Sequence, residues 1–339
     1  MLEKNAHSQL ELIVLPTEEC NFRCTYCYED FQIGRMNAAV VSNIKLLLER
    51  RAPDLSSFRY SWFGGEPLLA HDTITELCEH AINVCSQQSV AFVDGSVTTN
   101  GYGLSVKLAT RLINLRQRYF QVTLDGDETA HNLTRKHQSK HDSFAQIMRN
   151  MKALRDSDLN FEMLLRVHIR SDNVESVRAL IEQLNCQFLT DVRFKAHLKP
   201  IGNFGGPNKE SIDSLVLRSN ASQVINDLNK SLRHGSEHAA ASVKAVSAKA
   251  MCYASNPQSF VIRANGQINK CTVALDDERN LVGHLRDGGV LEFNTERFEH
   301  WMEGHYTADA ETIKCPYTYV RALPRDGARK VINIAAITA

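Results

Sequence analysis

Short apolar runs alternate with amphipathic stretches of helical length between about residue 10 and residue 200. The apolar runs predict six strands, over Glu11 to Leu15, Phe58 to Trp62, Ser96 to Thr98, Phe120 to Leu124, Met163 to Ile169 and Val192 to Leu198. Between them the helical period predicts five helices, over Asn37 to Arg51, Asp72 to Gln87, Leu104 to Gln117, Ser143 to Arg155 and Val174 to Asn185. Repeated strand and helix units are typical of an α/β fold around a parallel sheet. Because the repeat stops after six strands, the pattern favours a partial (β/α)6 TIM-like barrel over a full eight-unit one.

The pattern changes after residue 200. Pro200 to Pro207 is rich in proline and glycine, and it is followed by a polar helix predicted over Ser211 to Leu232 and an Ala/Ser-rich connector. From Cys252 onward the sequence predicts a short hairpin whose turn is the Asn265-Gly266 pair. We therefore expect a partial barrel over residues 1–205, a helical linker over 206–251 and a small C-terminal α+β extension over 252–339.

Composition and charge narrow the possible partners. The 339 residues are 43% hydrophobic and 23% charged, and Lys plus Arg equals Asp plus Glu at 39 each. A net charge of zero provides no long-range field to attract nucleic acid or an anionic membrane, so we expect neither as a partner. No apolar stretch approaches the roughly 20 residues that span a bilayer, and the N-terminus does not resemble a signal peptide. The nine cysteines, an odd number, indicate a reducing compartment. We therefore expect a soluble, cytoplasmic protein.

Three of these cysteines, Cys20, Cys24 and Cys27, lie within eight residues directly after the first predicted strand. By composition alone this spacing would arise about 0.006 times in such a chain. Three thiolates can ligate three irons of a four-iron cluster and leave the fourth iron open to a small molecule. Zinc is the alternative, but a structural zinc site needs a fourth ligand, and no further Cys or His lies between Glu18 and Met36.

The segment PTEECNFRCTYCYE resembles the cluster loop of the radical S-adenosylmethionine (SAM) superfamily. The resemblance implies that the three cysteines hold a redox 4Fe-4S cluster. In that family the open iron binds the amino and carboxylate groups of SAM, and an electron from the cluster cleaves SAM to a 5'-deoxyadenosyl radical. Tyr26 matches the position that packs near the adenine.

Three further segments resemble SAM-binding elements of this family, and each follows a predicted strand. Gly64, Gly65, Glu66 and Pro67 match the family's GGEP element, whose glycines let the backbone approach a ligand and whose glutamate can accept from an ammonium group. The TNG and LDG segments, with an arginine after the latter, resemble the elements that line the SAM ribose and carboxylate; the residues concerned are Thr99, Asn100, Asp125 and Arg135. The sequence assigns no catalytic side chain beyond these cofactor contacts.

The C-terminal region resembles the SPASM/twitch extension of radical SAM enzymes that modify peptides and proteins. Cys252 and Cys271 match its opening, and Cys315 matches one later cysteine. The family's neighbouring cysteine positions fall on Thr312, Arg321 and Arg325, and arginine cannot ligate iron. The three remaining cysteines hold a second iron-sulfur cluster, bind nothing, or pack as small hydrophobic residues. Cys78, Cys85 and Cys186 lie in predicted helices and are expected in the core.

By this resemblance we expect a maturase that abstracts hydrogen from a residue of a ribosomal peptide or protein. An external electron donor such as flavodoxin or ferredoxin would be a partner. Because the first strand begins near residue 11, we expect no leader-recognition domain before it. Substrate recognition would then lie in the barrel, in the tail region or on a separate leader-recognition protein. One alternative is a radical SAM enzyme acting on a small molecule, although the chain lacks the terminal Gly-Gly of the molybdenum-cofactor enzyme. Another is a non-catalytic iron-sulfur or zinc-binding partner protein, which would have no need of the GGEP segment.

Overall fold

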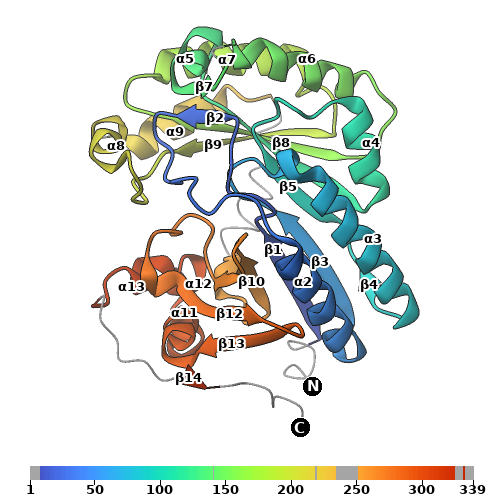
Figure 1. Cartoon of the computed structure of the whole chain (residues 1–339). Coiled ribbons are helices and arrows are strands. Elements are labelled where there is room, and N and C mark those ends of the chain that lie inside the picture. The colour runs from blue at the N-terminus through green and yellow to red at the C-terminus, as the bar shows by residue number, and fades with distance from the viewer. Residues whose placement is uncertain (1–7, 140, 218–219, 234–250, 325–330, 333–339) are drawn as a thin grey trace. The chain divides into compact units, whose positions relative to one another are not determined.

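The computed structural model describes residues 8–139, 141–217, 220–233, 251–324 and 331–332. Six strands alternate with helices along the chain, as predicted (Figure 1). The strands are β1 (Gln9–Val14), β3 (Ser57–Trp62), β5 (Gly95–Thr99), β6 (Gln117–Leu124), β8 (Glu162–Ile169) and β9 (Phe194–Pro200). The helices between them are α2 (Ala38–Arg51), α3 (His71–Gln87), α4 (Val106–Asn114), α6 (Ser143–Arg155) and α7 (Val174–Gln187). Every predicted strand and helix of this series is therefore confirmed, and α6 has the predicted bounds.

The chain packs as two compact units. The first comprises Met1–Glu19, Phe31–Gly95 and Ala250–Ala339, and the second comprises Cys20–Asp30 and Ser96–Lys249. The cysteine loop therefore packs with the second unit, whereas the residues on both sides of it pack with the first. This division follows packing alone, and the domain boundaries expected at residues 205 and 251 stay predictions.

The sheet of the first unit joins the N-terminal strands to the C-terminal extension. Its strand order is β14-β13-β12-β11-β10-β1-β3, and β4 (Ala91–Phe92) also pairs with β3. The added strands are β10 (Ser259–Ile262), β11 (Gln267–Asn269), β12 (Leu281–Arg286), β13 (Val290–Asn294) and β14 (Val331–Ile332). β10 and β3 lie parallel to β1 on its two sides, whereas the strands from β10 to β14 pair antiparallel. Gly266, at φ +82°, forms the predicted turn between β10 and β11.

Short helices complete the C-terminal extension. They are α11 (Thr295–Thr307), α12 (Ala310–Lys314) and α13 (Tyr317–Val320), with 3-10 turns η3 (Tyr253–Ser255) and η4 (Glu278–Asn280). Trp301 on α11 is buried, donates from Nε1 to the carbonyl of Arg279 at 3.0 Å and stacks on Tyr317. The extension is therefore the small α+β element expected from the sequence. The N-terminal half of this unit adds two more 3-10 turns, η1 (Ala52–Asp54) and η2 (Pro67–Ala70).

The second unit contains four neighbouring strands of the main sheet, in the order β5-β6-β8-β9. Along β8, the residues Met163, Leu165, Val167 and Ile169 are fully buried and alternate with partly exposed ones. One face of this strand therefore contributes to the core, and α6 and α7 lie along the sheet (Figure 1). A separate two-stranded ladder pairs β2 (Phe22–Cys24) antiparallel with β7 (Arg135–His137), and α5 (Glu128–Thr134) precedes β7. The sequence did not predict these three elements.

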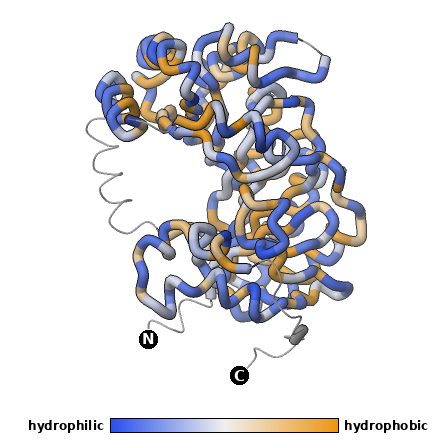
Figure 2. The backbone as a smooth tube through the Cα atoms, turned by 90° about the vertical axis from the view of Figure 1, so that its left-hand side faces the viewer, coloured by the Kyte–Doolittle hydropathy of each residue, from blue (hydrophilic) through white to orange (hydrophobic). Residues whose placement is uncertain are grey.

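Several local predictions are corrected. The helix expected over 211–232 is split into α8 (Lys209–Leu215) and α9 (Ala221–Lys230). The Ala/Ser-rich connector lies outside the described residues. Cys78 and Cys85 are buried as predicted, but Cys186 is exposed because it lies on the solvent side near the end of α7. Along the described chain, apolar and polar residues alternate over short distances (Figure 2). No described helix combines the length and apolarity needed to cross a membrane.

Candidate active site

The three loop cysteines lie on and around β2. Cys24 is the last residue of this strand and stands opposite Arg135 in the ladder with β7. The amide of Cys27 donates to the carbonyl of Cys24 at 3.1 Å, and the amide of Phe22 donates to Sγ of Cys20 at 3.3 Å. All three side chains are partly exposed. The loop is thus ordered by backbone hydrogen bonds to β7 and within itself.

The protonation of these thiols depends on what is bound to them. Burial raises the pKa of Cys24, and burial followed by the charge of Cys24 raises the pKa of Cys27 to about 12. The bare thiols of Cys24 and Cys27 are therefore neutral, and a bound cation would be needed to deprotonate them. In the described part of the chain, no group of three or more His, Cys, Asp or Glu residues is already arranged around a metal position. The donor chemistry, three soft sulfurs in one loop, fits an iron-sulfur cluster.

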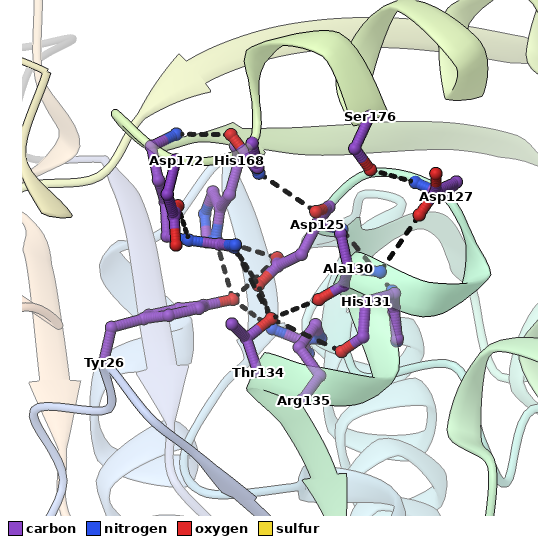
Figure 3. A network of polar contacts seen from close by, with 12 residues as sticks. Tyr26, Asp125, Asp127, Ala130, His131, Thr134, Arg135, His168, Asp172 and Ser176 are labelled. Carbon is purple, nitrogen blue, oxygen red and sulfur yellow. Dashed lines mark hydrogen bonds and ion pairs between the residues drawn. The ribbon is translucent and has the colours of Figure 1, made fainter.

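Tyr26, between the last two cysteines, is fixed by a buried polar network (Figure 3). Its hydroxyl donates a hydrogen bond to Oδ1 of Asp125 at 2.7 Å and accepts one from Nη1 of Arg135 at 3.0 Å. It also lies 3.1 Å from Nδ1 of His168. A hydroxyl has one proton, which Asp125 accepts, so His168 must be the donor to Tyr26. Nδ1 of His168 therefore carries the proton, and Nε2 is the acceptor nitrogen.

Asp125 is the centre of this network and is fully buried. Its Oδ2 accepts from Oγ1 of Thr134 at 2.8 Å and from Nη1 of Arg170 at 3.3 Å, while Arg170 also pairs with Asp172. A buried carboxylate is tolerated because these donors replace its hydration. Both oxygens of Asp125 are used within the protein. Its direct contact with SAM stays a prediction that would require one of these bonds to be replaced.

Arg135 has unused hydrogen-bonding capacity next to the cysteines. The side chain is 8% exposed and lies with its guanidinium over the ring of Phe22. Its Nε is buried without a hydrogen-bond partner among the described residues. An unsatisfied buried donor on a cation fits an anionic ligand, such as a carboxylate or a thiolate-bound cluster.

Two histidines of this region are held neutral. Burial, followed by the positive charges of nearby arginines, lowers the pKa of both His131 and His168 well below its usual value. Nδ1 of His131 accepts from the amide of Asp125 at 3.4 Å. No motif in the sequence marks His168 or Arg170. The available signal was that both are polar and lie in RVHIR, at the carboxyl end of a strongly apolar strand.

The GGEP segment packs against the chain that leads into the cysteine loop. Gly64 is at φ +122°, and a Cβ there would lie 2.2 Å from the carbonyl oxygen of Thr17. A Cβ on Gly65 would lie 2.4 Å from the carbonyl oxygen of Glu19. The close backbone approach that the glycines were expected to offer a ligand is therefore made to the protein's own residues 17–19. Oε1 of Glu66 accepts a hydrogen bond at 3.1 Å from the amide of Leu68, the residue that follows Pro67. Binding of the SAM ammonium by Glu66 stays a prediction.

Thr99 and Asn100 are buried at the end of β5. Oγ1 of Thr99 accepts from the amide of Gly101, and Oδ1 of Asn100 accepts from the amide of Tyr102. Nδ2 of Asn100 donates to Oδ1 of Asn21 at 2.8 Å, and Asn21 directly follows Cys20. The TNG segment therefore holds the start of the cysteine loop, while its contact with ribose stays a prediction.

The C-terminal cysteines come from three separate places. The amide of Cys252 donates to the carbonyl of Ile313 at 3.1 Å, which brings Cys252 close to the segment that carries Cys315. Burial raises the pKa of Cys252 and raises that of Cys271 to about 11. Cys271 is buried, but Cys315 is exposed, so packing as a small hydrophobic residue does not account for Cys315.

Comparison with known proteins decides the family. The family model of the radical SAM superfamily matches residues 14–184. This chain belongs to the radical SAM superfamily. As a member it is an enzyme, its α/β fold is the partial barrel of that family, and its cofactors are SAM and a 4Fe-4S cluster.

The individual relatives resemble this chain at low sequence identity or over a small part of its length. The cysteine-type anaerobic sulfatase-maturating enzyme of Clostridium novyi (strain NT) is 22% identical over 349 residues, which cover 95% of this chain and 88% of that enzyme. The GTP 3',8-cyclase of Haemophilus influenzae (strain 86-028NP) is 31% identical over 99 residues, only 27% of this chain and 26% of the cyclase.

Solved structures show the same fold. Native anSMEcpe with bound AdoMet and Cp18Cys peptide has a TM-score of 0.66 at 19% identity, over 92% of this chain and 87% of that one. Native anSMEcpe with bound AdoMet has a TM-score of 0.62 at 19% identity, over 81% of this chain and 78% of that one. Because the identities are low, these likenesses establish the architecture and not the substrate.

Proposed function

We propose that this radical SAM enzyme reductively cleaves SAM to a 5'-deoxyadenosyl radical and abstracts hydrogen from a residue of a ribosomal peptide or protein. The product would be a crosslink, an epimer or an oxidised side chain. The observation that carries the proposal is the similarity to a sulfatase-maturating enzyme over 95% of the chain, C-terminal extension included. The peptide in the anSMEcpe structure adds support for a substrate of this class.

In this proposal the loop cysteines Cys20, Cys24 and Cys27 hold the cluster. Tyr26, Gly64–Pro67, Thr99, Asn100, Asp125 and Arg135 bind SAM. The fixed charge of Arg135 lowers the cost of thiolates at Cys24 and Cys27, because it stands opposite Cys24 in the β2–β7 ladder. The hydroxyl contacts of Tyr26 hold its ring in one orientation, as a residue that packs on an aromatic ligand requires.

His168 has a further role in this proposal. Its Nδ1 proton is held by Tyr26, and its depressed pKa keeps Nε2 free of a proton. The side chain is 15% exposed, so Nε2 can accept a hydrogen bond from an N–H or O–H group of a ligand. We expect it to orient SAM or the substrate and not to carry charge.

A second candidate is a small-molecule substrate. The partial match to GTP 3',8-cyclases favours it, but that match covers about a quarter of either chain. The peptide proposal accounts for more of the sequence and is therefore preferred. An electron donor such as flavodoxin or ferredoxin, and a separate leader-recognition protein, are further proposed partners. We also propose a cytoplasmic location, because three of the nine cysteines crowd into one loop, which fits metal ligation in a reducing compartment.

The proposal is tested by anaerobic reconstitution with iron and sulfide, followed by a strong reductant and SAM. The protein should form 5'-deoxyadenosine, and Cys24→Ala should abolish it. The matched control is Cys186→Ala, because Cys186 is an exposed cysteine on α7 and should leave cleavage unchanged. Deuterium transfer from a labelled candidate peptide into 5'-deoxyadenosine would establish the substrate class. Full cleavage by the Cys24→Ala protein would overturn the cluster assignment.

A further inference from the structure

A buried ion pair joins the C-terminal hairpin to the segment before the cysteine loop. Glu18 is 1% exposed and Arg263 is 8% exposed, and both belong to the first compact unit. Nη2 of Arg263 donates to Oε2 of Glu18 at 2.5 Å, and Nε lies 3.2 Å from each carboxylate oxygen. The amide of Ala264 also donates to Oε1 of Glu18 at 3.2 Å.

Both side chains of the pair have their hydrogen-bonding groups engaged within the protein, so the loss of either partner should be destabilising. Nη1 of Arg263 donates to the carbonyl of Leu275 at 3.0 Å, so the guanidinium is engaged on two sides. Fork-shaped pairing of this kind fixes direction as well as distance, and lysine cannot reproduce it fully. Removing one partner would leave a buried charge without compensation.

Glu18 lies within the three residues that contact the GGEP segment. The amide of Gly65 donates to the carbonyl of Thr17 at 3.3 Å, and the amide of Glu66 donates to the carbonyl of Glu19 at 2.9 Å. The two glycines leave no room for a side chain at this contact. Any displacement of residues 17–19 must therefore be transmitted to Gly64, Gly65 and Glu66. Cys20 is the next residue of the chain.

We propose that Arg263 is a positioning residue for SAM binding. Through Glu18, it sets the backbone of residues 17–19, and this backbone in turn sets the GGEP segment. The C-terminal extension then supports the SAM site through this ion pair, whatever clusters it holds. The inference rests on the proposed function in one respect, namely that SAM binds at residues 64–67.

The first test uses the protein without cofactors. Hydrogen exchange at the amides of Gly65 and Glu66 should be at least about tenfold faster in Arg263→Met than in the native protein. The matched control is Arg279→Met. Arg279 belongs to the same extension and pairs with Asp277, but it holds the carbonyls of Arg321 and Leu323 instead. That control should leave exchange at Gly65 and Glu66 unchanged, and equal exchange rates in both variants would overturn the inference.

The second test measures SAM affinity in the iron-loaded protein. Arg263→Met should weaken SAM binding by about tenfold or more with cluster iron retained, and Arg263→Lys should recover part of the loss. The double variant Glu18→Gln with Arg263→Met removes both charges. It should recover thermal stability but not SAM affinity. Recovery of both would mean that the pair only stabilises the fold, which overturns the inference. If Arg263→Met does not fold, Arg263→Lys is assessed by the same exchange criterion.

Failure of the proposed function would look different. If the exchange at Gly65 and Glu66 responds to Arg263 but the native protein neither binds nor cleaves SAM, the positioning contact stands and the SAM assignment falls. If SAM binds tightly and equally in the native and Arg263→Met proteins, the proposed function stands and this inference falls.

Discussion

Two groups of three cysteines lie in this chain, and they differ in how they are supported. Cys20, Cys24 and Cys27 share one loop, which pairs with β7 and stands beside the buried cation of Arg135. The second group, Cys252, Cys271 and Cys315, comes from three segments, and one of its thiols is exposed. A short loop fixes the distances between its thiols by itself, whereas a dispersed set depends on the packing of every segment. The first group therefore has the features of a cofactor site, and the second has kept only part of them.

Iron content gives the largest expected difference between the two groups. Changing Cys20, Cys24 and Cys27 together to alanine should give iron-free protein after anaerobic reconstitution. Changing Cys252, Cys271 and Cys315 together should leave about four irons per chain, because we expect one cluster. Iron and sulfide analysis of both variants checks this. If the variant without Cys20, Cys24 and Cys27 still retained about four irons, a second cluster would be established, and the native protein would hold about eight irons.

The buried polar network around Asp125, which holds Tyr26 between the loop cysteines, should also contribute to stability. Asp125→Asn removes the only buried carboxylate beside Arg135 and Arg170 among the described residues of Figure 3, and it should destabilise the protein by about 3–5 kcal/mol. Asp172→Asn is the matched control, because Asp172 also pairs with Arg170 but is 54% exposed, and it should cost about 1 kcal/mol or less. Urea unfolding of the cofactor-free proteins measures both. Equal losses of stability in the two variants would mean that pairing with Arg170, and not the burial of Asp125, determines the effect.

The same contrast explains what could be predicted from the sequence. The six strands and five helices were predictable because each carries its own apolar period, and Cys20, Cys24 and Cys27 because their spacing is local. The β2–β7 ladder was not, because three-residue strands have too short a pattern to stand out from a loop. Nor was the pairing of β10 with β1, which joins residues about 250 positions apart.

Polar residues of the site followed the same rule. Asp125 and Arg135 were predicted through a motif, but His168, which meets them at the hydroxyl of Tyr26, was not, because a single histidine in an apolar strand has no spacing to mark it. The Glu18–Arg263 pair was missed for the same reason, since each residue reads alone as a surface charge and only the fold buries both.

A pH dependence of stability also separates the two regions. In the C-terminal extension Lys270 is fully buried, and burial lowers its pKa to about 7 from the usual 10.5. Its Nζ donates to the carbonyls of Asn256 and Ser259 at 2.6 and 2.7 Å. Because the unfolded chain keeps this proton up to about pH 10.4 while the folded protein releases it near 7, stability should rise with pH between these values, by at most about 1.4 kcal/mol per pH unit.

Lys270→Met should abolish that rise. His168→Gln in the cysteine-loop region should leave it intact. Because the pKa of His168 is depressed in the folded protein, the unfolded chain takes up a proton at this histidine first as the pH falls. The contribution of neutral His168 to stability is therefore present above about pH 6.5 and is lost only as the pH falls below that value. Urea unfolding from pH 5 to pH 10 in both variants checks the two windows. A rise above pH 7 that survives in Lys270→Met would show that Lys270 stays charged in the fold. The two carbonyls and the rings of Phe260 and Phe298 would then stabilise the ammonium more than burial disfavours it.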